Sequence, residues 1–166
     1  DVVSVLVGAG ANVDKAETDD GSTPLFIASQ EGHGDVVSVL VGAGADVDKA
    51  RTDTGSTPLS VASQEGHGDV VSVLVGAGAN VDKAETDDGS TPLSIASQNG
   101  HGDVVSVLVS AGADGDKART DDGSTPRFIA SHQGHGDAVS GRGGAGADEE
   151  EAQTTTAWPR VRVAGH

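Results

Sequence analysis

Residues 21–29 read GSTPLFIAS, and closely similar stretches begin at Gly55, Gly89 and Gly123, each 34 residues after the one before. A fixed period of 20 to 50 residues is typical of repeat proteins, in which each unit is one small supersecondary element that buries its apolar face against its neighbours. The period therefore predicts a linear stack of units. Such stacks usually hold another molecule, so the sequence indicates a class of activity and not a particular partner.

Local rules predict a first helix within each unit, over residues 24–30 in the first complete copy. The hydroxyl of Thr23 can accept a free backbone N–H at the helix start, and Pro24 suits the first helical position because the N–H it lacks would have no partner there. Gly32-His33-Gly34 is expected to end this helix.

A second helix is predicted from Asp35, whose carboxylate would lie at the positive end of the helix dipole. The run VVSVLV at 36–41 could also be a strand, because Val favours strands. Spacing favours the helix, since Val37, Leu40 and Val41 would share one helical face. We expect Gly44 to end this helix in the left-handed conformation, and the polar residues 45–54 to form a projecting hairpin loop.

These residues resemble the ankyrin repeat family, whose units of about 33 residues carry a TPLHxA signature. The signature reads TPLFIA at 23–28, TPLSVA at 57–62, TPLSIA at 91–96 and TPRFIA at 125–130. The Gly-His turns, the Val pairs of the second helix and the GA(D/N)VD entry to the loop extend the resemblance over residues 1 to about 137. It implies an all-α solenoid of stacked helix-turn-helix repeats with projecting β-hairpin loops and a period of 34.

The sequence also departs from the family pattern. Phe26, Ser60, Ser94 and Phe128 replace the signature His, the loop holds an extra residue, and Gly42 and Gly76 lie in the last turn of the second helix. Each interior Gly costs about 0.5–1 kcal/mol relative to Ala, so we expect a weakly stable array.

The expected organisation is a partial repeat at 1–20 (second helix and loop), repeats at 21–54, 55–88 and 89–122, a degenerate terminal repeat at 123–147 and a disordered acidic tail at 148–166. Gly141, Gly143 and Gly144 leave the last unit without an apolar second helix, although a polar capping repeat is the alternative. Because residue 1 matches the middle of a unit, we expect both termini to be cuts through a longer protein.

Composition narrows the class of function. The chain has 26 acidic and 10 basic residues, a formal charge of −16, no Cys and no apolar run long enough to span a membrane. Nucleic-acid binding depends on Lys and Arg that displace counterions, so no nucleic acid is expected as a partner. No signal peptide is visible, and an intracellular location is favoured only as a general expectation.

Several patterns could indicate catalysis, cofactors or metals, and each has a simpler structural interpretation. The VLVGAGA stretches and the glycines at 141, 143 and 146 resemble parts of a dinucleotide-binding turn but lack its strand–turn–helix setting. His33, His67, His101 and His135 lie one repeat apart, too far to share an ion, and we expect hydrogen bonds to backbone instead. A weak metal site at His132, His135 and Asp137 and a calcium loop at Asp46-Val47-Asp48 are minor alternatives. We therefore expect no catalytic residue, no metal and no cofactor.

The remaining signal is variation between repeats. The loops alternate with a period of 68, so that Glu17, Arg51, Glu85 and Arg119 would form a row of alternating sign. This row could simply relieve repulsion, because exposed ion pairs contribute only about 0–1 kcal/mol. It could instead belong to an acidic concave surface, which the family resemblance implies for the loop tips and the first helix. Phe26, if partly exposed, would be its anchor.

We predict a noncatalytic scaffold that binds an unidentified protein with a neutral or basic surface, and no membrane or small-molecule substrate. The candidate partner-binding residues are Glu17, Asp20, Phe26, Gln30, Glu31, Arg51, Thr54, Gln64, Glu65, Glu85, Asp88, Gln98, Asn99 and Arg119. The alternatives are a structural spacer or decaying array without its own partner, the targeting arm of a larger enzyme or adaptor, and nucleotide-dependent enzymology through the Gly motifs.

Overall fold

A computed structural model describes residues 1–136, and in this part of the chain there are eight helices and no strand. They are α1 (Val2–Gly8), α2 (Pro24–Gln30), α3 (Gly34–Gly42), α4 (Pro58–Glu65), α5 (Gly68–Gly76), α6 (Pro92–Asn99), α7 (Gly102–Ser110) and α8 (Pro126–Gln133). The predictions that concern Asp137, the glycines at 141–146 and the tail at 148–166 lie outside the described residues.

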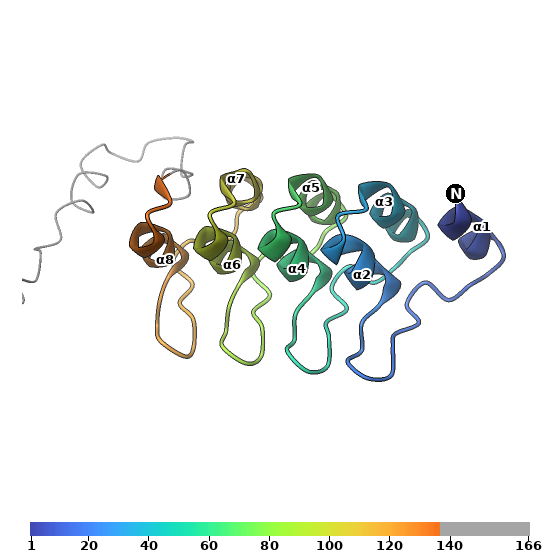
Figure 1. Cartoon of the computed structure of the whole chain (residues 1–166), viewed down its shortest axis with the longest axis horizontal. Coiled ribbons are helices and arrows are strands. Elements are labelled where there is room, and N and C mark those ends of the chain that lie inside the picture. The colour runs from blue at the N-terminus through green and yellow to red at the C-terminus, as the bar shows by residue number, and fades with distance from the viewer. Residues whose placement is uncertain (137–166) are drawn as a thin grey trace, which may run out of the picture.

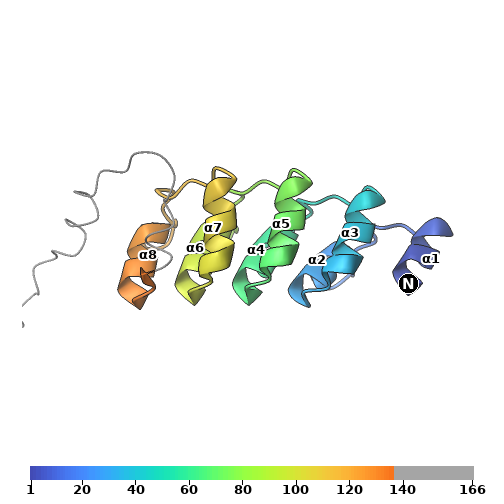
Figure 2. The ribbon, with the colours of Figure 1, turned by 90° about the horizontal axis from the view of Figure 1, so that it is seen from above.

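The helices form two rows with long loops extending from one side (Figure 1). One row holds α2, α4, α6 and α8, and the other holds α1, α3, α5 and α7 (Figures 1 and 2). Each helix of a pair packs on the other and on its counterpart in the next unit, as α2 does on α3 and α4. The predicted all-α solenoid is confirmed.

The signature residues cap and anchor the first row of helices. The Thr23 hydroxyl accepts the N–H of Phe26 at 3.2 Å, and Pro24 is the first residue of α2 as predicted. Ser60 and Ser94, which replace the family's His, bond to the capping threonines: the Ser60 and Thr57 hydroxyls lie 3.1 Å apart, and Ser94 Oγ accepts the Thr91 N–H at 2.9 Å. These serines therefore fix the helix starts from inside the fold.

The core is a continuous seam of aliphatic side chains between the two rows. Leu25, Leu59 and Leu93 of the signature are buried, and Leu74 and Leu108 of the second row meet them from the other side. At the N-terminal end of the stack apolar side chains are uncovered, since Val2 and Val5 of α1 are 75% and 70% exposed.

Glycines with positive φ end the helices, and some of them, such as Gly66, also lie against the next unit. Gly44 has φ +87° just after α3, as predicted, and Gly66 has φ +77° at the end of α4. A Cβ on Gly66 would lie 2.7 Å from the ring of His101 in the next unit. His101 Nε2 is in turn 2.9 Å from the backbone oxygen of Gln64, so this histidine joins neighbouring units through backbone, as expected.

Candidate functional site

Stacked loops form one edge of the candidate site, and backbone hydrogen bonds hold them side by side. The N–H of a threonine in each loop donates to a carbonyl of the preceding loop at 2.8–2.9 Å: Thr52 to Asp20, Thr86 to Thr54 and Thr120 to Asp88. The loops project and reverse direction as predicted, through turns (Figure 1). They contain no strand in the described residues, so they are not β-hairpins in secondary structure.

The GA(D/N)VD entry to each loop forms a second set of bonds between loops. Asp48 accepts the N–H of Asn80 at 2.9 Å, and Asp46 accepts the N–H of Asp48 at 3.0 Å within its own loop. Lys83 Nζ then donates to the Asp48 carbonyl at 2.8 Å. Asp46 therefore stabilises the turn within its own loop, and Asp48 joins its loop to the next one.

Two arginines bridge neighbouring loops. The Arg51 guanidinium is 3.1 Å from Asp20 of the preceding loop and 2.6 Å from Asp53 of its own loop. Arg119 repeats this arrangement 68 residues later, at 2.6 Å from Asp88 and 2.9 Å from Asp121, and reaches Gln98 at 3.4 Å. Both arginines therefore form their ion pairs with aspartates, and none of these pairs involves the glutamates of the predicted row.

Phe26 is buried, with 2% of its surface exposed, so the condition on which it would be an aromatic anchor is not met. The Arg51 guanidinium carbon lies 5.5 Å from its ring centroid, and its helix α2 packs on α4 of the next unit. The matching residue of the last described helix, Phe128, is 51% exposed and stacks on His132. The difference arises because position 26 faces the following unit, which Phe128 lacks among the described residues.

The other candidate residues line the same side of the stack. Glu31, Gln64, Glu65, Gln98 and Asn99 are exposed at the ends of the first-row helices, and Gln30 is half-buried. Glu17 is exposed in the first loop, whereas Asp20, Arg51, Thr54, Glu85, Asp88 and Arg119 are half-buried between loops.

A pocket of about 430 Å³ lies between α4 and α6, under the loop 80–88, and is called the central pocket below. Gln64 and Glu65 line one side, and Gln98 and Asn99 line another. The remaining lining residues are Glu85, Asp88, Ser90 and Ile95. The central pocket is open to solvent and mostly polar, so it suits a polar or charged group.

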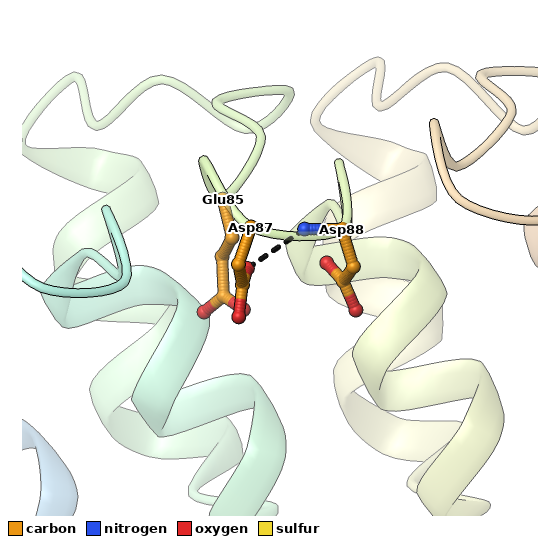
Figure 3. Close-up of side chains that lie close together, drawn as sticks. All are labelled: Glu85, Asp87 and Asp88. Carbon is orange, nitrogen blue, oxygen red and sulfur yellow. Dashed lines mark hydrogen bonds between the residues drawn. The ribbon is translucent and has the colours of Figure 1, made fainter.

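Three carboxylates gather in the loop above this pocket. Oxygens of Glu85, Asp87 and Asp88 lie within 4.8 Å of one another, and Figure 3 shows Glu85 and Asp87 pointing the same way. Burial raises the pKa of Glu85, and the negative charges of Asp87 and Asp88 act in the same direction, while a hydrogen bond with Ser56 and the charge of Arg119 oppose them. The loop thus holds negative charge close together.

The carboxylates that bind arginine or cap a turn behave in the opposite way. The N–H of Ser22 lowers the pKa of Asp20, and Ser124 does the same for Asp122. A hydrogen bond from Arg51 lowers the pKa of Asp53. These groups are therefore stabilised as anions, unlike Glu85.

Sequence reasoning missed Asp53, Asp87 and Asp121, which occupy the same position in three successive loops. The signal was present, because each lies two residues after Arg51, Glu85 or Arg119. The spacing alone does not show the contact: only in the folded loops do Arg51 and Arg119 turn back onto the aspartate two residues later.

Comparison with known proteins identifies the family. A family model described as ankyrin repeats (3 copies) matches residues 1–85 and again residues 79–140. The chain belongs to the ankyrin repeat family, whose repeats are generally protein–protein interaction modules. A search of curated proteins found no match. Within residues 1–136, no helix has the length and apolar character needed to cross a bilayer.

Proposed function

We propose that this protein is a noncatalytic scaffold that binds another protein through the surface formed by its loops and the ends of α2, α4 and α6. The observation that carries the proposal is the collection of acidic loops along one edge. The loops 12–20 and 80–88 each have four acids and one Lys, a charge of −3, and the loops 46–54 and 114–122 have charges of −1 and −2.

The backbone bonds between loops support a preorganised surface. Because Thr52, Thr86 and Thr120 fix each loop against the one before, little conformational entropy is lost when a partner binds. A concentrated negative field attracts a basic surface and raises the association rate, an effect that weakens as salt increases. The partner is therefore a protein with a neutral or basic contact surface.

The experiment begins with affinity capture of a partner on the full 166-residue chain, followed by a binding titration with the purified partner. The variant E17K/E31K/E65K reverses three exposed charges on the proposed surface. The control D35K/D69K/D103K makes the same charge change at the starts of α3, α5 and α7. Circular dichroism verifies that both variants fold.

We expect the first variant to bind the partner more weakly and to lose the salt dependence of binding. The control should keep both the affinity and the salt dependence of the unmodified chain. Equal effects of the two variants would contradict a defined binding surface. Failure to recover any saturable partner would favour the structural spacer.

A further inference from the structure

We propose that the central pocket receives an arginine side chain of the partner protein, with Glu85 and Asp87 as the carboxylates that bind its guanidinium. This inference rests on the proposed function, because it specifies the chemistry of the same surface. It follows from the differences among the three junctions between consecutive loops of this one chain.

Two of the three junctions already hold a guanidinium. At the first, Arg51 lies between Asp20 and Asp53, and at the third, Arg119 lies between Asp88 and Asp121. In both, the Nε and a terminal nitrogen of the guanidinium donate to the two oxygens of the aspartate two residues later. This is the paired geometry in which carboxylates bind arginine most strongly.

The middle junction has the receiving carboxylate and lacks the arginine. Asp87 corresponds to Asp53 and Asp121, and its Oδ1 accepts the N–H of the following residue at 2.9 Å, as theirs do. Position 85 holds Glu where the others hold Arg. The side chain that would donate to Asp87 is thus replaced by a second acceptor, and the two carboxylates lie together (Figure 3).

Glu85 also accounts for the space beneath the loop. It lines the central pocket, and its side chain is shorter than the arginine at the matching positions. Gln98, which accepts from Arg119 at the third junction, corresponds to Gln64, which lines this pocket. A guanidinium from outside would therefore meet Glu85 and Gln64 in the pocket and Asp87 in the loop above it, while Thr54 stands at the position from which Asp88 binds Arg119.

An arginine is a better match than a lysine for this arrangement. Its planar guanidinium offers several N–H donors at once, so it can satisfy Glu85, Asp87 and a glutamine oxygen together. The ammonium of lysine is a compact, strongly hydrated charge and lacks the paired geometry.

The probe is the capped peptide acetyl-Gly-Arg-Gly-amide, titrated into the ¹⁵N-labelled full chain while amide chemical shifts are recorded. We expect saturable shifts of the amides at 64–65, 85–88 and 98. The same peptide with citrulline, which keeps the shape and lacks the charge, should leave these amides unmoved. Loss of a charge-assisted pair of hydrogen bonds should make E85Q/D87N bind the arginine peptide about tenfold more weakly.

The chain provides a matched control and a reverse test. E17Q/D19N makes the same changes in the first loop, where no described first-row helix precedes it, and should bind the peptide as the unmodified chain does. T54D/E85R should reproduce the other two junctions, fill the pocket with an internal arginine and abolish peptide binding.

Equal shifts with the citrulline peptide, or unchanged binding by E85Q/D87N, would overturn the proposal. Shifts of the same amides by Ca²⁺ without any by the arginine peptide would also overturn it, since the carboxylates would then be a metal site. If E85Q/D87N leaves partner binding intact while E17K/E31K/E65K removes it, the arginine pocket fails and the proposed function stands.

Discussion

Replacing Gly66 with Ala tests how each unit is joined to the next. Gly66 follows α4 with φ +77°, and its missing Cβ leaves room for the ring of His101. The substitution therefore does two things at once. It forces a residue with a Cβ into the left-handed region, and it places that carbon 2.7 Å from the Cε1 and Nδ1 atoms of His101.

The two effects can be estimated separately. An L-residue in the left-handed conformation costs about 1–2 kcal/mol. Displacing His101 breaks its contact with the Gln64 carbonyl at 2.9 Å, and a hydrogen bond contributes about 0.5–1.5 kcal/mol to stability. The free energy of unfolding should therefore fall by about 1.5–3.5 kcal/mol.

The control is Gly44→Ala. Gly44 has φ +87°, and apart from its two chain neighbours no residue has an atom within 4 Å of the place its Cβ would take, so only the conformational cost of about 1–2 kcal/mol applies. Urea unfolding followed by circular dichroism at the helical minimum measures both variants. Equal destabilisation by the two substitutions would refute the claim that His101 couples the units.

Three further substitutions test other contacts. Arg51→Ala should lower the free energy of unfolding by about 1–2 kcal/mol, because it removes partly exposed ion pairs and the cation–π contact with Phe26, and thermal unfolding will show whether it does. Gly42→Ala should stabilise the chain by about 0.5–1 kcal/mol in urea unfolding, since Gly42 is the last residue of α3 and a Cβ there meets nothing within 4 Å. Because the pKa of Glu85 is raised above its ordinary value of 4.5, the folded chain holds this proton more tightly than the unfolded chain, and stability is lost as pH rises through the folded pKa. Glu85→Gln removes this titration, so the melting temperature measured across pH should fall less above pH 4.5 in the variant than in the unmodified chain. For each of the three substitutions, an unfolding or pH curve identical to that of the unmodified chain would contradict the stated reason.

Much of the fold could be predicted from local sequence. Thr23 and Pro24 mark a helix start, Gly44 marks an end, and the spacing of Val37 and Leu40 selects a helix over a strand. These features depend on residues within one unit, so they can be predicted without knowing what the unit packs against. The repeat boundaries themselves stay a prediction.

The environment of each side chain was less predictable, because it depends on the neighbouring unit. Phe26 and Phe128 occupy the same position of the signature, yet one is buried and the other is half exposed. The Thr-Pro pair before them and the Ile-Ala-Ser after them are the same, so these neighbours do not distinguish the two phenylalanines. The presence of a following unit does.

The pairing of the loops was missed for a related reason. The sequence repeats every 34 residues, but the backbone hydrogen bonds between loops join residues 32 apart, such as Thr52 and Asp20. Arg51 consequently lies beside Asp20 and binds it, instead of Glu17, one full period earlier. This offset of two residues arises from the way neighbouring loops pack, and it cannot be predicted from the repeat length.

The most direct test of the proposed binding surface is amide hydrogen exchange of the full chain, free and bound to its captured partner. We predict slower exchange on binding at residues 17–20, 51–54, 85–88 and 119–122 and at the ends of α2, α4 and α6. Exchange in α3, α5 and α7 should be unchanged. Protection confined to α3, α5 and α7 would place the partner on the opposite face and contradict the proposed surface.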